Sequence, residues 1–191
     1  MIFHESVPEI DRERILRALK DIKEHGDRFQ FETADFIEAF EVGVFLDVAE
    51  NVGGSGSVQL ISQRRARRAV GRGGLSVRDA AKFVGLNIAR ETIDTGGQRG
   101  IEGTIVHEGK HARDFALMLS SFSKGSDSGV FNPTAYQREY SAHLTSALYL
   151  LRRGGEYTAE GISLGILFEY NGSCLLYTSP SPRDCNEYLV C

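Results

Sequence analysis

The sequence has few cysteines, no tryptophan and no long apolar segment. Its 191 residues include no tryptophan, and its three cysteines, Cys174, Cys185 and Cys191, all fall in the last 18 positions. Residues 1–173 therefore lack cysteine, which excludes a disulfide scaffold, a thiolate zinc site and a cysteine nucleophile there. No apolar run approaches the roughly 18 residues that a membrane helix needs. The N-terminal residues also lack the pattern of a signal peptide, so we expect a cytoplasmic protein or one delivered by a non-classical route.

The last 18 residues differ from the rest of the chain. Residues 174–184 back-translate into DNA that resembles a transposon-end sequencing adapter, and 188–191 resemble the flow-cell sequence that follows an index barcode. We interpret 174–191 as a non-native, adapter-derived tail, which leaves open where the natural C-terminus lies. Without the tail's one arginine and two acidic residues, the formal net charge changes from −4 to −3. Residues 1–173 suit a single domain.

Hydrophobic periodicity predicts a helix at the N-terminal end, followed by a sheet. Pro8 suits a first helical turn and Gly26 suits a helix end. Between them, one apolar stripe is formed by Ile15, Leu19 and Ile22. A shorter helical piece is expected around Phe36. Residues 42–48 alternate as a strand, and we expect 58–61 to be its partner across a glycine-rich connection.

The sequence pattern in the second half of the chain predicts one more strand, which lies between helices. Ser76 with Asp79 suits the cap of a short helix that reaches Val84, and 86–93 alternates as a strand. Two stronger helices follow, the first around 101–119. Asn132 and Pro133 suit the start of the second, and Arg152, Arg153 and Gly154 suit its end. The order of elements predicts an α+β fold with a short, mainly antiparallel sheet.

The first strong helix contains an HExxH motif, His107-Glu108-Gly109-Lys110-His111. Residues four apart lie one turn apart on one face of a helix, so two imidazoles can bind one metal ion. Glu108 then projects near the remaining metal position, where its carboxylate can take a proton from a water molecule. Zinc lowers the pKa of that water and polarises a carbonyl, so the motif predicts peptide hydrolysis near neutral pH.

The helical wheel separates the motif from the core. One side carries Ile101, Ile105, Ala112, Ala116 and Leu119. His107, His111, Asp114 and Met118 fall roughly on the opposite side. We therefore expect the helix to bury one face and to present its histidines to a cleft. The alternative is a pair of solvated histidines.

Glu139 is the best candidate for a third ligand, because it lies on the capped helix 133–153. It borders a stripe that we expect to face inward, formed by Tyr136, Tyr140, Ala147 and Leu151. A carboxylate there completes a set of two histidines and one glutamate and leaves one position for water. His143, one turn later, is the competing ligand, and Asp127 is a poorer one. The alternative for Glu139 is a surface position at the helix edge.

With these residues the chain resembles the gluzincin type of zinc metallopeptidase. Residues 104–111 resemble its active-site helix, and Glu139-Tyr-Ser-Ala142 resembles its ExxA-type glutamate helix. The extension 111–114 and the small size resemble compact HExxH domains of bacterial polymorphic toxins and related effectors. The resemblance covers about residues 86–153, and Gly109 stands where that group often has a bulky residue.

The resemblance implies a small zincin-like fold, a zinc cofactor and a protein or peptide substrate. It implies that His107, His111 and Glu139 bind zinc and that Glu108 is the general base. The strand 86–93 would be the sheet edge along which the substrate pairs by β-augmentation.

Three further side chains have two readings each. Asp114 can orient a ligand histidine, or it can form an ion pair with Arg113 or another neighbour. Tyr136 and Tyr140 can donate to the oxyanion of the reaction, although core packing is the simpler role for both.

A basic cluster supports a different class of function. Within nine residues it comprises Arg64, Arg65, Arg67, Arg68 and Arg72. Such a run can contact phosphates, but the mildly acidic balance of the chain argues against nucleic acid as a partner, and a solvated helix end is the simpler reading. Two alternatives to a peptidase remain: an inactive binding domain that uses this cluster, and a structural metal site without turnover.

Overall fold

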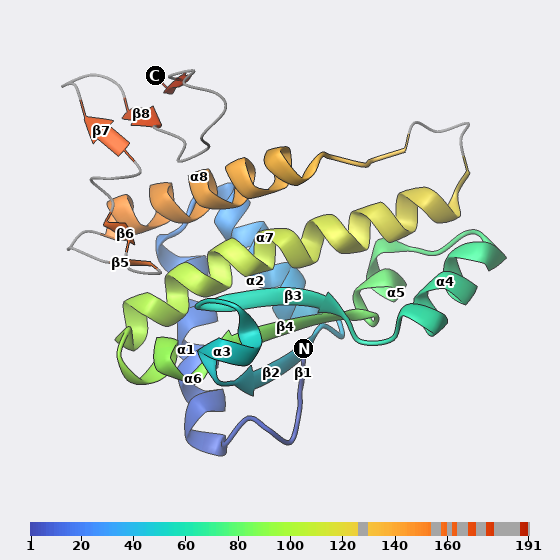
Figure 1. Ribbon diagram of the computed structural model, residues 1–191, viewed down its shortest axis with the longest axis horizontal. Helices are drawn as coiled ribbons and strands as arrows, with labels where there is room; N and C mark the ends of the chain where they lie inside the picture. The colour runs from blue at the N-terminus through green and yellow to red at the C-terminus, as the bar shows by residue number, and fades with distance from the viewer. Residues whose placement is uncertain are drawn as a thin grey trace.

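The computed structural model describes residues 1–125 and 130–153 in full (Figure 1). The helices are α1 (Glu9–His25), α2 (Arg28–Ala39), α3 (Ala49–Val52), α4 (Gln63–Arg72), α5 (Val77–Ala81), α6 (Arg90–Asp94), α7 (Gly97–Ser123) and α8 (Ala135–Arg153). The strands are β1 (Ile2–Phe3), β2 (Gly43–Asp47), β3 (Gly56–Leu60) and β4 (Val84–Ala89). Beyond residue 153 only the backbone of short strands is described, namely β5 (Thr158–Ala159), β6 (Ile162–Ser163), β7 (Phe168–Tyr170), β8 (Leu175–Tyr177) and β9 (Tyr188–Val190).

The main sheet has the strand order β1-β2-β4-β3. β1 pairs with β2 and β2 pairs with β4 in parallel, whereas β3 runs antiparallel to β4. The α+β class is therefore confirmed, but the prediction of a mainly antiparallel sheet is wrong for these four strands. The predicted pairing of 42–48 with 58–61 is also wrong, because β4 lies between β2 and β3. Every residue of β4 is buried, as expected for a central strand.

Helix α7 is the centre of the fold. It packs against β3 and β4 and against α1, α2, α5, α6 and α8 (Figure 1). The predicted core face is confirmed, because Ile101, Ile105, Ala112 and Ala116 are buried and Leu119 packs against the same core. The opposite face is not left open to solvent, since α8 lies along it.

Several helix boundaries differ from the predicted ones for local reasons. The strand predicted at 86–93 ends at Ala89, and residues 90–94 form α6. The helix predicted to reach Val84 ends at Ala81, because Val84 begins β4. At the start of α8 the cap is Thr134, whose backbone N–H donates to Gln137 Oε1 at 2.9 Å while the Gln137 N–H donates to Thr134 Oγ1 at 3.2 Å. This reciprocal pair replaces the predicted cap at Asn132.

The buried stripe of α8 agrees with the predicted one at Ala147 but differs from it at Tyr136 and Leu151. Tyr136 and Leu151 are 42% and 41% exposed, whereas Ala142, Ser146 and Tyr149 are buried. Spacings of four and three residues keep this second set on one face of the helix. Within the described residues, no helix has both the length and the apolar character that crossing a membrane requires.

Candidate metal centre

Helices α7 and α8 bring the predicted ligands together. The Nε2 atoms of His107 and His111 are 3.2 Å apart. Glu139 Oε2 lies 3.7 Å from His107 Nε2 and 3.4 Å from His111 Nε2. A tetrahedral zinc ion with bonds of about 2.0 to 2.1 Å holds its ligand atoms about 3.3 to 3.5 Å apart. The three atoms therefore form a triangle of the size that one zinc ion requires.

His143 stands beside this triangle. Its ring centroid is 4.5 Å from that of His107, in an edge-on arrangement. Ligand atoms of His107, Glu139 and His143 lie within 4.8 Å of one another, so His143 belongs to a second possible ligand set. In the set with His111 the three separations are 3.2, 3.4 and 3.7 Å, close to the spacing that one zinc ion requires. We therefore take His111 as the second ligand and His143 as the nearest alternative.

The electrostatics of the triangle favour a cation. Burial and the neighbouring His107 lower the pKa of His111 to about 4, so its imidazole is neutral near pH 7. A hydrogen bond from His107 and the charges of the histidines lower the pKa of Glu139 to about 2, although partial burial opposes this. A neutral imidazole and an ionised carboxylate are the forms that bind zinc.

The site lines a pocket of about 360 Å³ between α7, α8 and β3. The lining residues include Glu108, whose carboxylate Oε1 is 4.0 Å from His107 Nε2 and whose side chain is only 7% exposed. Gly56, Ser57 and Val58 of β3 form another wall. The structure thus brings together all four principal residues of the motif, and it adds a strand that the sequence did not associate with them.

Two glycines allow the close packing around Glu108. A Cβ atom on Gly56 would lie 2.6 Å from Glu108 Cγ and from Thr104 Cγ2, so only glycine lets β3 approach α7 here. A Cβ atom on Gly109 would lie 2.7 Å from Ile37 Cδ1 and from Thr33 Cγ2. Glycine at position 109 therefore lets α2 pack closely against α7 at this point.

The identity of the edge strand is a correction. We expected 86–93 to be the free edge, but β4 is paired on both sides. β3 is one of the two edge strands of the main sheet, the other being β1, and β3 borders the pocket. The alternating pattern of 86–93 is typical of a strand but does not reveal how many neighbours the strand has.

The remaining predicted residues lie outside the pocket lining. Buried Asp114 accepts a hydrogen bond from Lys110 Nζ at 2.6 Å, so it forms an ion pair within α7. Tyr136 and Tyr140 stack with ring centroids 6.2 Å apart, and neither is among the described residues that line the pocket. Asp127 lies outside the described residues.

Phe115 and Arg138 line the pocket and were missed by the sequence argument. The guanidinium of Arg138 lies over the Phe115 ring, 5.6 Å from its centroid. Arg138 precedes Glu139, and Phe115 follows His111 by one helical turn. These positions relative to the predicted ligands, one adjacent in sequence and one a helical turn later, are the signal that could have identified Arg138 and Phe115.

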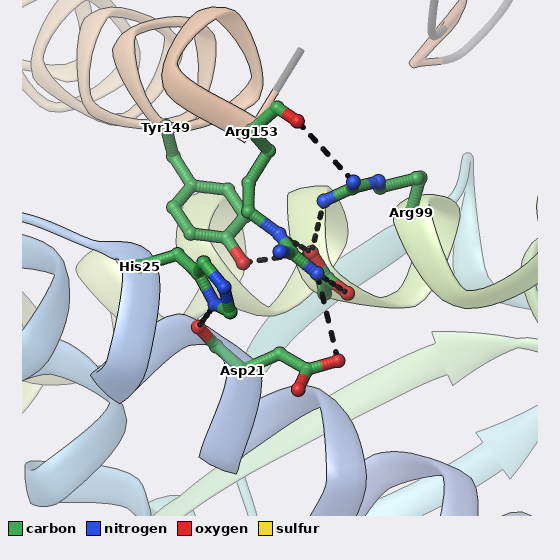
Figure 2. A network of polar contacts seen from close by, with 6 residues as sticks. Asp21, His25, Arg99, Tyr149 and Arg153 are labelled. Carbon is green, nitrogen blue, oxygen red and sulfur yellow. Dashed lines mark hydrogen bonds and ion pairs between the residues drawn. The ribbon is translucent and has the colours of Figure 1, made fainter. Parts of the chain in front are cut away.

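A second polar cluster joins α7 to α8 and α1 (Figure 2). We call it the anchor cluster; it comprises Asp21, Arg99, Glu102, Tyr149 and Arg153. Tyr149 Oη donates to Glu102 Oε2 at 2.7 Å, and Arg153 Nε donates to the same oxygen at 3.1 Å. Burial raises the pKa of Glu102, but hydrogen bonds from Arg153 and Tyr149 and the nearby arginine charges outweigh it and lower the pKa. The cluster fixes α8, and with it Glu139, against α7.

The chain matches no family model, and comparisons with curated proteins and with solved structures find no similar protein. The function is therefore inferred from the geometry of the site itself.

Proposed function

We propose that this protein is a zinc-dependent metalloendopeptidase in which His107, His111 and Glu139 hold the metal. The observation that carries the proposal is the triangle of their ligand atoms, with sides of 3.2, 3.4 and 3.7 Å. Three possible ligand atoms this close, from two helices, can bind one cation in place of the imidazole N–H proton that they otherwise share. The gluzincin-like order of the ligands along the chain supports the same reading.

When bound, zinc polarises the substrate carbonyl and lowers the pKa of a water molecule. Glu108 follows His107 directly and lies within the same pocket, so its carboxylate is placed to take the proton from the attacking water and to pass it to the leaving amine.

The free edge of β3 gives the pocket a means of binding an extended peptide. Ser57 and Val58 line the pocket, and among the strands that the structure describes β3 pairs with β4 alone. A substrate backbone can add to the other edge by β-augmentation, which would align a peptide bond with Glu108. This arrangement favours a polypeptide substrate over a small molecule.

The test combines metal content with hydrolysis. In every protein Cys174, Cys185 and Cys191 are replaced by serine, because thiolates would bind zinc independently of the proposed site. Elemental mass spectrometry should find about one zinc per chain, and the double variant His107→Ala/His111→Ala should lose it. Glu108→Gln should keep the zinc but cleave an unfolded protein substrate about 10²- to 10⁴-fold more slowly.

Each other result has a definite meaning. Folded protein that holds no zinc after zinc is supplied contradicts the metal site. Zinc that raises the melting temperature of a protein without any hydrolysis indicates a structural site. Hydrolysis that Glu108→Gln leaves unchanged comes from another source.

A further inference from the structure

The segment after the pocket strand is unusually basic for this chain. Residues 51–78 contain six arginines and no Asp or Glu, although the formal net charge of the whole chain is −4. Five of the six lie on α4, where buried Ala66 faces the body of the protein. Those five are exposed, namely Arg64, Arg65, Arg67, Arg68 and Arg72. Within the described part of the chain, none of the five has a carboxylate within 4.0 Å. α4 therefore presents a band of unneutralised charge.

β3 leads from the metal site to this helix. Gly56 lies against Glu108 at one end of the strand, and Leu60 lies at the other end, just before α4 (Figure 1). A strand rises about 3.3 Å per residue, so β3 spans roughly 13 to 17 Å. A peptide paired with the free edge of β3 would reach α4 about five to eight residues from the bond at the metal site.

Arg138 extends the positive charge into the pocket. It lines the pocket next to Glu139, and its Nη1 atom is 3.6 Å from Met118 Sδ. Phe115 and Met118 follow His111 along α7 in the direction of the end that packs against α4 and α5. Arg138 therefore lies on the α4 side of the metal site, and no carboxylate among the described residues pairs with it within 4.0 Å.

We propose that the pocket and α4 together recognise an acidic polypeptide segment as the substrate. Its carboxylates would pair with Arg138 near the metal site and with the arginines of α4 farther along β3. This inference rests on the proposed function, and it adds the substrate class. Every cation in 51–78 is arginine, whose planar guanidinium binds carboxylates in a bidentate manner. Phosphate would suit the same side chains, but α4 carries no aromatic residue for stacking bases.

The test measures binding separately from hydrolysis. Zinc-loaded Glu108→Gln protein is titrated into fluorescent peptides of about 16 residues, long enough to span β3 and α4. One peptide has Asp and Glu in its N-terminal half, one has them in its C-terminal half, and a third has Asn and Gln instead. Each is made with a free and an amidated C-terminus. One acidic peptide should bind at least about tenfold more tightly than the neutral one at low salt, and the difference should shrink at high salt.

Two variants and a matched control test which arginines bind the acidic peptide. Two variants are tested: Arg138→Gln, and a fourfold variant with Gln at Arg64, Arg65, Arg67 and Arg68. Each should reduce the ratio of the affinities for the acidic and the neutral peptide at least about threefold. One exposed ion pair increases an affinity at most about fivefold. The control removes four positive charges elsewhere, by changing Arg14, Arg17, Lys20 and Arg90 to Gln, and should keep the preference. Circular dichroism melts establish that each variant folds.

The possible outcomes separate the two proposals. Equal binding of acidic and neutral peptides, or an equal loss in the control, overturns acidic recognition. Binding lost on amidation means that Arg138 holds a terminal carboxylate and also overturns it. Binding of a DNA duplex that needs α4, without binding of acidic peptide, makes α4 a phosphate-binding helix instead. If acidic peptides bind through these arginines but wild type cleaves none of them, the peptidase proposal fails while the recognition stands.

Discussion

The α7/α8 pair carries two polar clusters, and their charges are balanced in opposite ways. In the anchor cluster, the Glu102 carboxylate meets only hydrogen-bond donors: Arg99, Tyr149 and Arg153. In the metal site, the Glu139 carboxylate meets His107 and His111, whose facing nitrogen atoms are themselves 3.2 Å apart. The first cluster is complete with protein groups alone, whereas the second brings together three atoms that can each act as a metal ligand.

This difference distinguishes a structural cluster from a functional one. A buried carboxylate that is paired with arginine needs nothing further. The three converging atoms can share the N–H proton of a neutral imidazole or can bind a metal ion, and the pKa of about 4 at His111 means that a second proton on its imidazole is disfavoured near neutral pH. A perturbed pKa alone would not separate the two clusters, because Glu102 and Glu139 are both shifted downward. The kind of partner separates them.

The largest expected effect is the loss of stability when the anchor cluster is broken. Glu102→Ala leaves Arg153, with its side chain only 15% exposed, without its main partner. Removing one member of a buried ion pair costs about 3 to 5 kcal/mol, so the free energy of unfolding should fall by that amount in urea titrations. Glu24→Ala, which removes an exposed carboxylate on α1, is the control and should change it by less than about 0.5 kcal/mol. A small effect of Glu102→Ala would mean that this end of α8 does not need the cluster.

The next prediction sharpens the assignment of the third ligand. Glu139→Ala should weaken zinc binding at least about 100-fold, because it removes a ligand with a negative charge. His143→Ala should weaken it only about tenfold, the lower end of the effect expected of a side chain outside the metal's coordination. Competition with a fluorescent zinc chelator measures both affinities. If His143→Ala has the larger effect, the ligand set is His107, His143 and Glu139, and the role of His111 must be revised.

The sequence predicts which residues meet at the candidate metal site better than it predicts the sheet. The two histidines and Glu108 depend on local helical spacing, which a motif displays directly, and the helix carrying Glu139 also has clear local signals. The neighbours of β4 depend on strands about 25 to 40 positions away, so alternation in 86–93 could not show that this strand is central. Likewise, Tyr149 contacts Glu102 although the two residues are 47 positions apart in the sequence, and no local pattern around either residue predicts this contact.

The smallest expected effect concerns pH and metal-free protein. The pKa of His111 is about 4 in the folded chain and about 6.5 when unfolded, so as pH falls below 6.5 the unfolded state takes up a proton first. Stability is therefore highest above pH 6.5 and declines until the folded state also binds the proton near pH 4. The loss contributed by His111 should reach about 2 kcal/mol at pH 5. Urea titrations with a chelator present, from pH 8 to pH 5, measure it.

Matched variants isolate the histidine responsible. His111→Gln should flatten the decline by about that amount, because glutamine does not titrate. His25→Gln should not, because His25 is exposed. Zinc should steepen the decline in wild type, since protons then compete with the metal for the same nitrogen atoms. An unchanged decline in His111→Gln would show that the imidazole is not held neutral by its surroundings, and the contrast between the donor-rich metal site and the saturated anchor cluster would lose its electrostatic basis.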